Sequence, residues 1–190
     1  MGKILCFISQ DFADFEITFA LHKLRNVGGM DVLAVGYDDQ PVTSESGLAY
    51  RPHLDLAAAQ ELDNIDGLLL PGGPIREQKE ALTEWIAKLH RERRLLAAIC
   101  NGPQYLGRAG VLNDRRFTTS CSAERIRQLG ASDPFPWDRY VDERVVRDGH
   151  VITAKGRAFI DFSFALFDAL DIYGGRASER DQLFRDVMNR

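Results

Sequence analysis

The chain has 190 residues, of which 45% are hydrophobic, and its 24 basic and 28 acidic side chains leave a formal net charge of −4. Charges of both signs are spread along the sequence, which argues against a basic block for nucleic acid or for an anionic membrane surface. The three cysteines are widely spaced and include no CxxC pair, so they indicate neither a disulfide framework nor a zinc site.

The length fits one domain over residues 1–190 that buries about 70% of the surface exposed by its unfolded chain. A strand-like run begins at Ile4, which leaves no room for a signal peptide, and no apolar stretch approaches the ~20 residues of a membrane span. We therefore expect a cytoplasmic protein that acts on a small molecule, with no metal, cofactor, nucleic acid or membrane as its partner.

Apolar runs alternate with helical patterns along the first two thirds of the chain. The run at residues 4–8 is continuously apolar, which is typical of a central parallel strand covered on both faces. The helix that follows is expected to use Phe15 in its apolar stripe and carries Glu16 in its first turn. The predicted elements are strands at 4–8, 32–37, 66–70 and 95–100, helices at 14–27, 54–62, 78–93, 102–109 and 123–129, and an extended ribbon at 41–50.

The last third continues the pattern and completes the predicted architecture. Asp148-Gly149 predicts a tight turn that joins two strands within 145–153, and it leaves His150 exposed. Residues 117–121 predict another short strand, residues 159–170 a helix that is buried nearly all round, and the charged tail after Gly175 an amphipathic segment at best. The alternation of strands and helices predicts an α/β fold, a three-layer α/β/α sandwich with a mostly parallel sheet.

One strand-to-helix turn stands out, at Ala97-Ala98-Ile99-Cys100-Asn101-Gly102-Pro103. Small residues on either side of Cys100 let the backbone turn tightly, as in a nucleophile elbow that exposes the central side chain at the end of a sheet. Helix N–H groups directed at the sulfur would lower the pKa of its thiol. The pattern leaves open whether Cys100 is a reactive thiol or a buried structural cysteine.

The topology brings other residues toward this turn. The carboxyl ends of parallel strands share one edge, so the first helix with Glu16 and the turn at Gly72-Gly73 converge on Cys100. Backbone N–H groups near Gly73 and Asn101 could stabilise an anionic oxygen, with Gly72 as a further candidate for substrate binding. A protonated Glu16 could donate a hydrogen bond to the sulfur, although a carboxylate in a first helical turn is often only a partner for the helix dipole and solvent.

Five segments together resemble the ThiJ/PfpI superfamily over roughly residues 3 to 170. They are Phe15-Glu16-Ile17, Leu69-Leu70-Pro71-Gly72-Gly73, the Cys100 elbow, Ala109-Gly110-Val111-Leu112 and Val151-Ile152-Thr153-Ala154-Lys155-Gly156. The resemblance implies a flavodoxin-like fold related to class I glutamine amidotransferases, and a homodimer. It also implies Cys100 as nucleophile, Glu16 as its partner, and Gly73 and Asn101 at the oxyanion positions.

The chain departs from two histidine patterns of that superfamily. Protease-like and chaperone-like members have a histidine directly after the cysteine, where this chain has Asn101. Members similar to the parkinsonism-associated protein have a histidine after a Thr-Thr pair, where this chain has Ser120, followed by Cys121. Ser120 and Cys121 are therefore candidate pocket residues. No Cys-His dyad carries over, and a general base could be Glu16 itself or water, as in the isocyanide-hydrating branch.

Several functions remain open at this point. The first is a cysteine-dependent enzyme, a hydrolase or lyase, with hydratase, glyoxalase, deglycase or amidase-type chemistry on a small electrophile. The alternative is a redox or stress sensor in which Cys100 oxidises, with Cys121 as a resolving thiol. The missing histidine disfavours a peptidase, and the absence of a downstream His-x-Glu pair weakens an amidotransferase. A transcription regulator would need a further domain for which the chain is too short.

Overall fold

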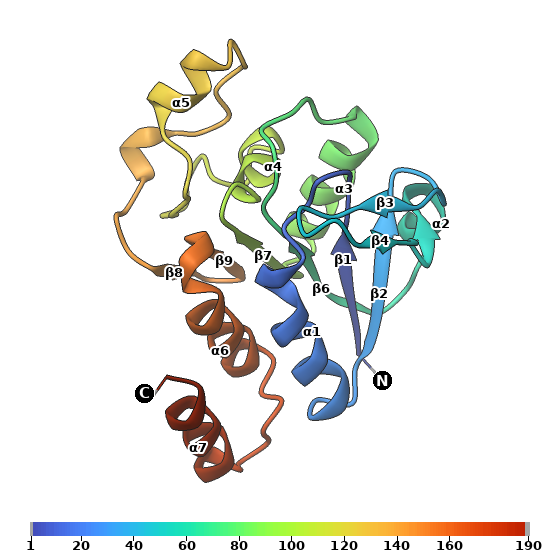
Figure 1. The fold of residues 1–190 in the computed structure, drawn as a ribbon, viewed down its shortest axis with the longest axis vertical. Helices are drawn as coiled ribbons and strands as arrows, with labels where there is room; N and C mark the ends of the chain where they lie inside the picture. The colour runs from blue at the N-terminus through green and yellow to red at the C-terminus, as the bar shows by residue number, and fades with distance from the viewer. Residues whose placement is uncertain (1, 189–190) are drawn as a thin grey trace.

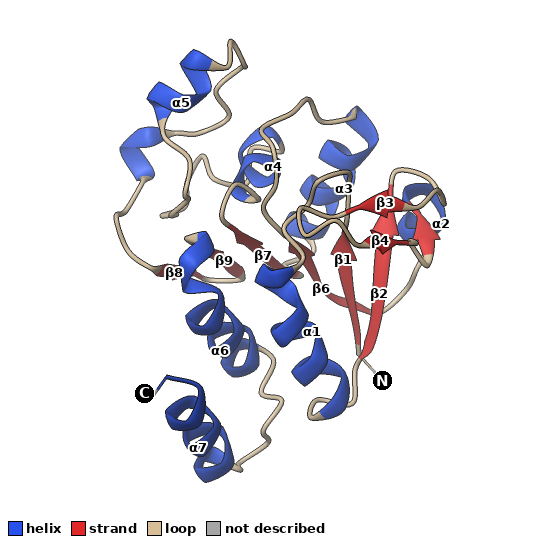
Figure 2. Ribbon diagram, viewed as in Figure 1, coloured by secondary structure: helices blue, strands red, loops and turns tan. Residues whose placement is uncertain are grey.

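A computed structural model describes residues 2–188 and contains a twisted sheet of seven strands (Figures 1 and 2). The strand order is β5-β2-β1-β6-β7-β9-β8, and every neighbouring pair is parallel except the hairpin of β8 and β9. The strands of this sheet are β1 (Lys3–Phe7), β2 (Asp31–Gly36), β5 (Leu54–Asp55), β6 (Ile65–Leu70), β7 (Leu95–Ile99), β8 (Val145–Asp148) and β9 (Val151–Ala154). The α/β architecture with a mostly parallel sheet is confirmed.

Helices cover both faces of this sheet (Figure 2). One face is covered by α1 (Phe15–Asn26) and α6 (Phe159–Ala169), and α7 (Ala177–Met188) adds Leu183 and Phe184 to the same apolar cluster. The other face is covered by α2 (Leu56–Gln60), α3 (Glu80–Arg91) and α4 (Pro103–Arg108), whereas α5 (Ala123–Gln128) lies beyond the sheet and adds Ile126 to the same apolar cluster. Among residues 2–188, no helix has the length and apolar character needed to cross a lipid bilayer.

The central strands are mostly apolar, and helices cover both of their faces. In β7 all five residues are buried, and in β1 only the first residue is partly exposed. Such continuous burial is the reason that these strands lack the alternating pattern of a half-exposed sheet. The parallel register of β1, β6 and β7 places their carboxyl ends at one edge, where Phe7, Leu70 and Ile99 are the last strand residues.

Three predictions from the sequence prove wrong in detail. Residues 117–121 do not form a strand, because only Phe117 makes a single bridge to Tyr140 and the rest of the segment turns under the elbow. Phe15 is 49% exposed rather than in the core, and its ring packs edge-on against Phe159. His150 is half-buried rather than exposed, because its Nε2 lies 2.9 Å from the Nδ1 atom of His90 at the end of α3.

A buried carboxylate fixes the start of α1 to the small hairpin formed by β3 (Val42–Thr43) and β4 (Ala49–Tyr50). Asp14 directly precedes the helix and is 4% exposed. It accepts hydrogen bonds from the hydroxyl groups of Ser44 at 3.0 Å, Ser46 at 2.7 Å and Tyr50 at 2.9 Å. Because a buried charge is costly without partners, these three donors hold the first turn of α1, and with it Glu16, at the sheet edge.

We expect Tyr50→Phe to lower the free energy of unfolding by about 1.5 kcal/mol, the usual contribution of a hydrogen bond to a charged group. The matched control is Tyr140→Phe, which removes a hydroxyl bonded to the side chains of the exposed Asp142 and of Lys155 and should change stability by less than about 0.5 kcal/mol. Urea denaturation of the two variants measures both values. Equal losses in the two variants would contradict the role given to the Asp14 cluster.

Candidate active site

Cys100 lies at the carboxyl edge of the sheet in a strained backbone conformation. It follows β7, and its φ of 62° lies in the left-handed region that residues with a side chain rarely adopt. Its N–H donates to the carbonyl oxygen of Ala154 at 2.8 Å. Its carbonyl oxygen accepts from Ser120 N at 2.9 Å and from the hydroxyl of Thr119 at 2.7 Å. These three bonds hold an elbow that would otherwise relax.

The Glu16 carboxyl group lies against the sulfur of Cys100. Glu16 is the second residue of α1 and is 2% exposed, and its carboxyl forms a hydrogen bond with the thiol. The N–H of Gly72 donates to Glu16 Oε2 at 2.7 Å. The structure thus brings together the helix, the glycine turn after β6 and the elbow.

Two glycines make room for this contact. A Cβ atom on Gly72 would lie 2.6 Å from Glu16 Oε2 and 2.7 Å from Cys100 Cβ. A Cβ atom on Gly156, which follows β9, would lie 2.7 Å from Glu16 Oε1 and 3.0 Å from Cys100 Sγ. Both distances to the carboxylate are shorter than real Cβ contacts, so any larger residue at either position would separate the thiol from the acid.

Backbone and side-chain donors surround the sulfur and the turn beside it. The N–H of Asn101 and the hydroxyl of Ser120 each form a hydrogen bond with Cys100, and the Ser120 oxygen accepts from Gly156 N at 2.9 Å. Asn101 Nδ2 donates to the carbonyl oxygen of Gly73 at 2.8 Å and fixes that turn. Gly73 has a φ of 149°, and its own N–H has no acceptor among residues 2–188.

Burial changes the proton affinity of both the thiol and the carboxyl group. Burial raises the pKa of Glu16 from 4.5 to about 7, with the hydrogen bonds from Gly72 and Cys100 in opposition. Burial and the charge of Glu16 raise the pKa of the Cys100 thiol to about 12, and the bonds from Ser120 and Asn101 oppose this rise. Adjacent anions repel, so the pair carries at most one negative charge at neutral pH. The lowered thiol pKa predicted from the elbow is thus wrong, because burial and Glu16 outweigh the donors.

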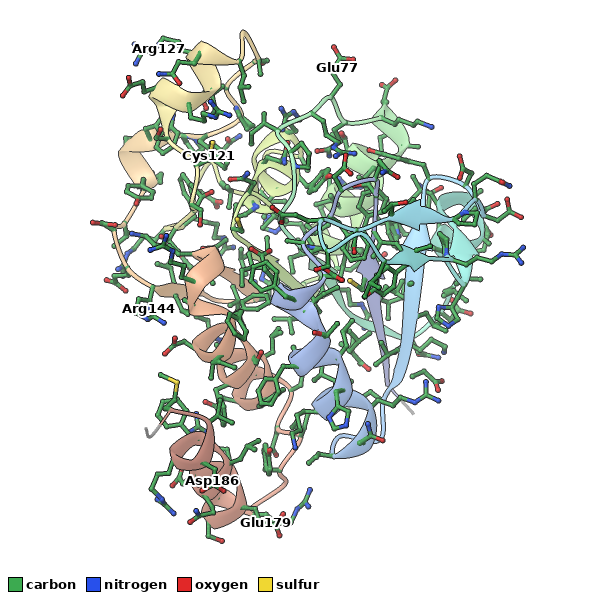
Figure 3. The ribbon with its side chains drawn as sticks, in the orientation of Figure 1. Glu77, Cys121, Arg127, Arg144, Glu179 and Asp186 are labelled. Atoms are coloured by element: carbon green, nitrogen blue, oxygen red, sulfur yellow. The ribbon has the colours of Figure 1, made fainter. Side chains whose placement is uncertain are left out.

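An open cleft of about 370 Å³ is lined in part by Cys100. Ser120 and Cys121 line it together with Cys100, and Figure 3 shows Cys121 between α5 and the body of the molecule. The remaining lining residues are Pro74, Ile75, Asn101, Arg125 and Leu129. None of these residues is a histidine, so the cleft described here offers no imidazole as a base.

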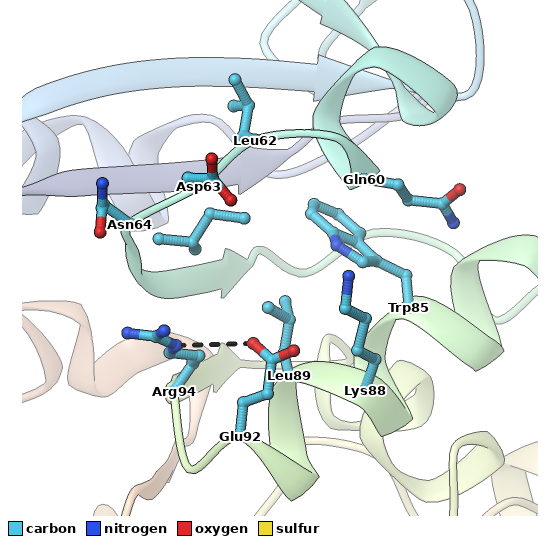
Figure 4. Close-up of a pocket in the computed structure, with 10 residues that line it drawn as sticks. Gln60, Leu62, Asp63, Asn64, Trp85, Lys88, Leu89, Glu92 and Arg94 are labelled. Atoms are coloured by element: carbon cyan, nitrogen blue, oxygen red, sulfur yellow. Dashed lines mark ion pairs between the residues drawn. The ribbon is translucent and has the colours of Figure 1, made fainter.

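A second cavity, of about 200 Å³, lies at the opposite edge of the sheet (Figure 4). It is lined by Ile65 at the start of β6 and by Arg94 just before β7, whose side chain pairs with Glu92. Lys88 and Trp85 of α3 also face it. No thiol or histidine lines this cavity, and within residues 2–188 no group of three or more His, Cys, Asp or Glu side chains could hold a metal ion.

Sequence comparison matches residues 2–180 to the DJ-1/PfpI family. The chain belongs to this family. It is 32% identical over 157 residues to a deglycase of Pyrococcus abyssi, covering 80% of this chain and 89% of the relative. It is 29% identical over 160 residues to an isonitrile hydratase of Pseudomonas putida, covering 82% of this chain and 66% of the relative.

The fold agrees with the solved structure of a DJ-1 superfamily protein of Agrobacterium tumefaciens. That chain superposes with a TM-score of 0.81 at 29% identity, and 98% of each chain is covered. The resemblance read from the five sequence segments is therefore confirmed for family and fold.

Two contributors to this DJ-1/PfpI site were not predicted from the sequence. Gly156 belongs to one of the five recognised segments. Its lack of a side chain leaves room for Glu16 and Cys100, and this depends on the position of β9 next to β7. Thr119 supports the elbow from a segment that was predicted to be a strand. The position of Gly156 two residues after a central strand could have indicated its role, whereas no local sequence pattern indicates the role of Thr119.

We expect Gly156→Ala to destabilise the protein by about 1–3 kcal/mol, the usual cost of an added methyl group in a packed site. The displaced thiol should also react with iodoacetamide at a changed rate. Arg157→Ala, at an exposed neighbouring position, is the matched control and should leave both properties unchanged. Urea denaturation and mass spectrometry of the Cys100 peptide measure the two effects, and a Gly156→Ala variant identical to wild type would contradict the crowding.

The raised pKa of Glu16 makes stability depend on pH. The folded protein holds a proton that the unfolded chain releases, so stability from this group is present below pH 4.5 and is lost as pH rises to about 7. Relative to Glu16→Gln, the free energy of unfolding of the wild type should fall by about 3 kcal/mol across this range. Denaturation at a series of pH values measures the difference. Glu124→Gln, at an exposed site, should show no such trend.

Proposed function

We propose that the protein is a cysteine-dependent enzyme that converts a small electrophile by addition of the Cys100 sulfur to an electrophilic carbon. The observation that carries this proposal is the contact between Cys100 and a buried Glu16 whose pKa is raised to about 7. A general base works best when its pKa lies near the working pH. Glu16 therefore supplies the base that the missing histidine would supply elsewhere.

The first step is the same for a carbonyl compound and for an isonitrile. The sulfur of Cys100 forms a bond to the electrophilic carbon, and the thiol proton passes to Glu16. In a carbonyl compound one π-electron pair moves to oxygen; in an isonitrile it moves to nitrogen, and the lone pair that stays on the carbon accepts the proton. The protonated Glu16 then returns this proton to the adduct. No oxidant or cofactor is needed for the addition, and water completes a hydration or hydrolysis.

The oxyanion that forms on a carbonyl substrate needs hydrogen-bond donors. We assign this role to the N–H groups of Gly73 and Asn101, as the family resemblance implies. Support comes from the Asn101 side chain, which fixes the Gly73 peptide at 2.8 Å, and from the Gly73 N–H, which has no acceptor among residues 2–188. The N–H of Gly72 already donates to Glu16, so its contribution is to hold the acid.

The volume of the cleft and the names of related proteins limit the range of candidate substrates. A volume of about 370 Å³ accommodates a small molecule. Relatives of this chain are named as deglycases and as an isonitrile hydratase. The substrate classes that follow are 2-oxoaldehydes with their adducts, and isonitriles.

The test is conversion of methylglyoxal and of cyclohexyl isonitrile by the purified protein, followed by product analysis. We expect turnover of at least one compound, complete loss with Cys100→Ser, and a fall in kcat of about 10²–10⁴-fold with Glu16→Gln, the usual contribution of a general base. Cys6→Ala changes a thiol that is 1% exposed and lines a different cavity, so it serves as the control with unaltered kinetics.

Inactivity of the wild type on both classes would overturn the enzyme proposal. Selective oxygen addition at Cys100 after mild peroxide in such an inactive protein would favour the redox sensor, with Cys121 in the same cleft as the candidate resolving thiol.

A further inference from the structure

One wall of the Cys100 cleft carries a single permanent charge. Arg125 of α5 and Leu129, which directly follows this helix, lie on this wall, and the other lining residues are neutral or apolar apart from the thiols. The acid beneath the floor, Glu16, is almost wholly buried. A substrate that reaches the sulfur therefore passes one guanidinium group and no exposed carboxylate of the lining.

The orientation of α5 is fixed by its own residues. Ile126 is 1% exposed and belongs to the core, which sets the rotation of the helix. Arg125 and Leu129 are four residues apart and share the face that lines the cleft. The hydroxyl of Ser122 caps the helix by accepting from Arg125 N at 3.2 Å. Arg127 is not part of the lining, and Figure 3 shows it on the side of α5 that faces away from the molecule.

The guanidinium of Arg125 has no hydrogen bond or ion pair within residues 2–188. The carboxylates near it are engaged elsewhere. Glu124 accepts from Gln128 Nε2 at 3.2 Å, and Asp133 accepts from Trp137 Nε1 at 2.7 Å and from a backbone N–H. Asp133 still lowers the positive potential at this wall, which makes the expected effect modest. Arg125 is thus a positive donor at the mouth of the cleft whose hydrogen bonds are free for a ligand.

We propose that Arg125 is a specificity-determining residue that binds the carboxylate of a small aldehyde or ketone whose carbonyl carbon is attacked by Cys100. The inference rests on the proposed function, because it names the substrate class for the same site. A guanidinium pairs with a carboxylate through two parallel hydrogen bonds, which would also orient the carbonyl group toward the sulfur. The addition is redox-neutral: the S–C bond forms, the carbonyl pair moves to oxygen, and the thiol proton ends on that oxygen through Glu16.

The first experiment compares two alkylating reagents that differ in charge. Iodoacetate and iodoacetamide both form an S–CH₂ bond to Cys100 and release iodide, but only iodoacetate is an anion. Mass spectrometry of the Cys100 peptide at neutral pH and low salt gives the ratio of the two rates. We expect this ratio to fall about three- to ten-fold in Arg125→Gln, as one unit charge near the reagent predicts, and further in Arg125→Glu.

Two variants act as controls. Arg125→Lys keeps the charge and should keep most of the ratio, whereas Arg127→Gln removes a charge that does not line the cleft and should leave the ratio unchanged. High salt should reduce the wild-type preference. Equal ratios in the wild type, Arg125→Gln and Arg125→Glu would overturn the proposal, and so would an equal fall in Arg127→Gln.

The second experiment uses glyoxylate and methylglyoxal, which are similar in size and differ in charge. Each compound can form a reversible hemithioacetal with Cys100 and so protect it from iodoacetamide. Arg125→Gln should raise the half-protecting concentration of glyoxylate three- to ten-fold and leave that of methylglyoxal unchanged. An equal rise for both would overturn the proposal. Neither experiment needs turnover, so a protein that converts no substrate would refute the proposed function while these measurements still decide the role of Arg125.

Discussion

The contact between one buried carboxyl group and one thiol constrains the structure around it. Glu16 is 2% exposed, and a buried acid needs either a proton or donors. The N–H of Gly72 supplies one donor at 2.7 Å, and burial raises the pKa of the carboxyl group to about 7, so that it holds a proton below that pH. Side chains at positions 72 and 156 would occupy the same space, so glycine stands at both. The left-handed φ of 62° at Cys100, which costs on the order of 1–3 kcal/mol, directs the sulfur into this space.

The topology of the sheet makes that contact possible. Strands β1, β6, β7 and β9 are parallel neighbours, so the segments after them meet at one edge: α1 with Glu16, Gly72, Cys100 and Gly156. Glu16 contributes the acid, Gly72 the N–H that donates to it, Cys100 the thiol, and Gly156 the space beside both side chains. The Asp14 cluster keeps the first turn of α1 in place at this edge. The sheet edge and the Asp14 cluster thus hold the side chains of Glu16 and Cys100 next to each other.

Sequence patterns predicted what depends on local periodicity and on the rule that parallel strands share a carboxyl edge. The buried strands, the Cys100 elbow and the approach of Glu16 followed from these two sources. Features that depend on contacts between distant segments could not be predicted from these sequence patterns. Residues 117–121 have a composition typical of a strand. However, the Thr119 hydroxyl and the Ser120 N–H donate to the carbonyl oxygen of Cys100 and not to a neighbouring strand. His150 is polar and follows a turn, but the neighbouring end of α3 places His90 against it.

The shift of the Cys100 thiol pKa also depends on contacts between distant segments, which the sequence pattern did not predict. An elbow at a helix start suggests a thiolate, because local donors favour the charged sulfur. Burial and the Glu16 carboxylate act in the other direction and raise the thiol pKa to about 12. The burial that disfavours a resting thiolate also raises the pKa of Glu16 to about 7, where a carboxylate can accept a proton at neutral pH. In the reaction that we propose, Cys100 becomes nucleophilic as its proton moves to Glu16, and the transfer is complete when the substrate carbon has bonded to the sulfur and its oxygen has accepted hydrogen bonds.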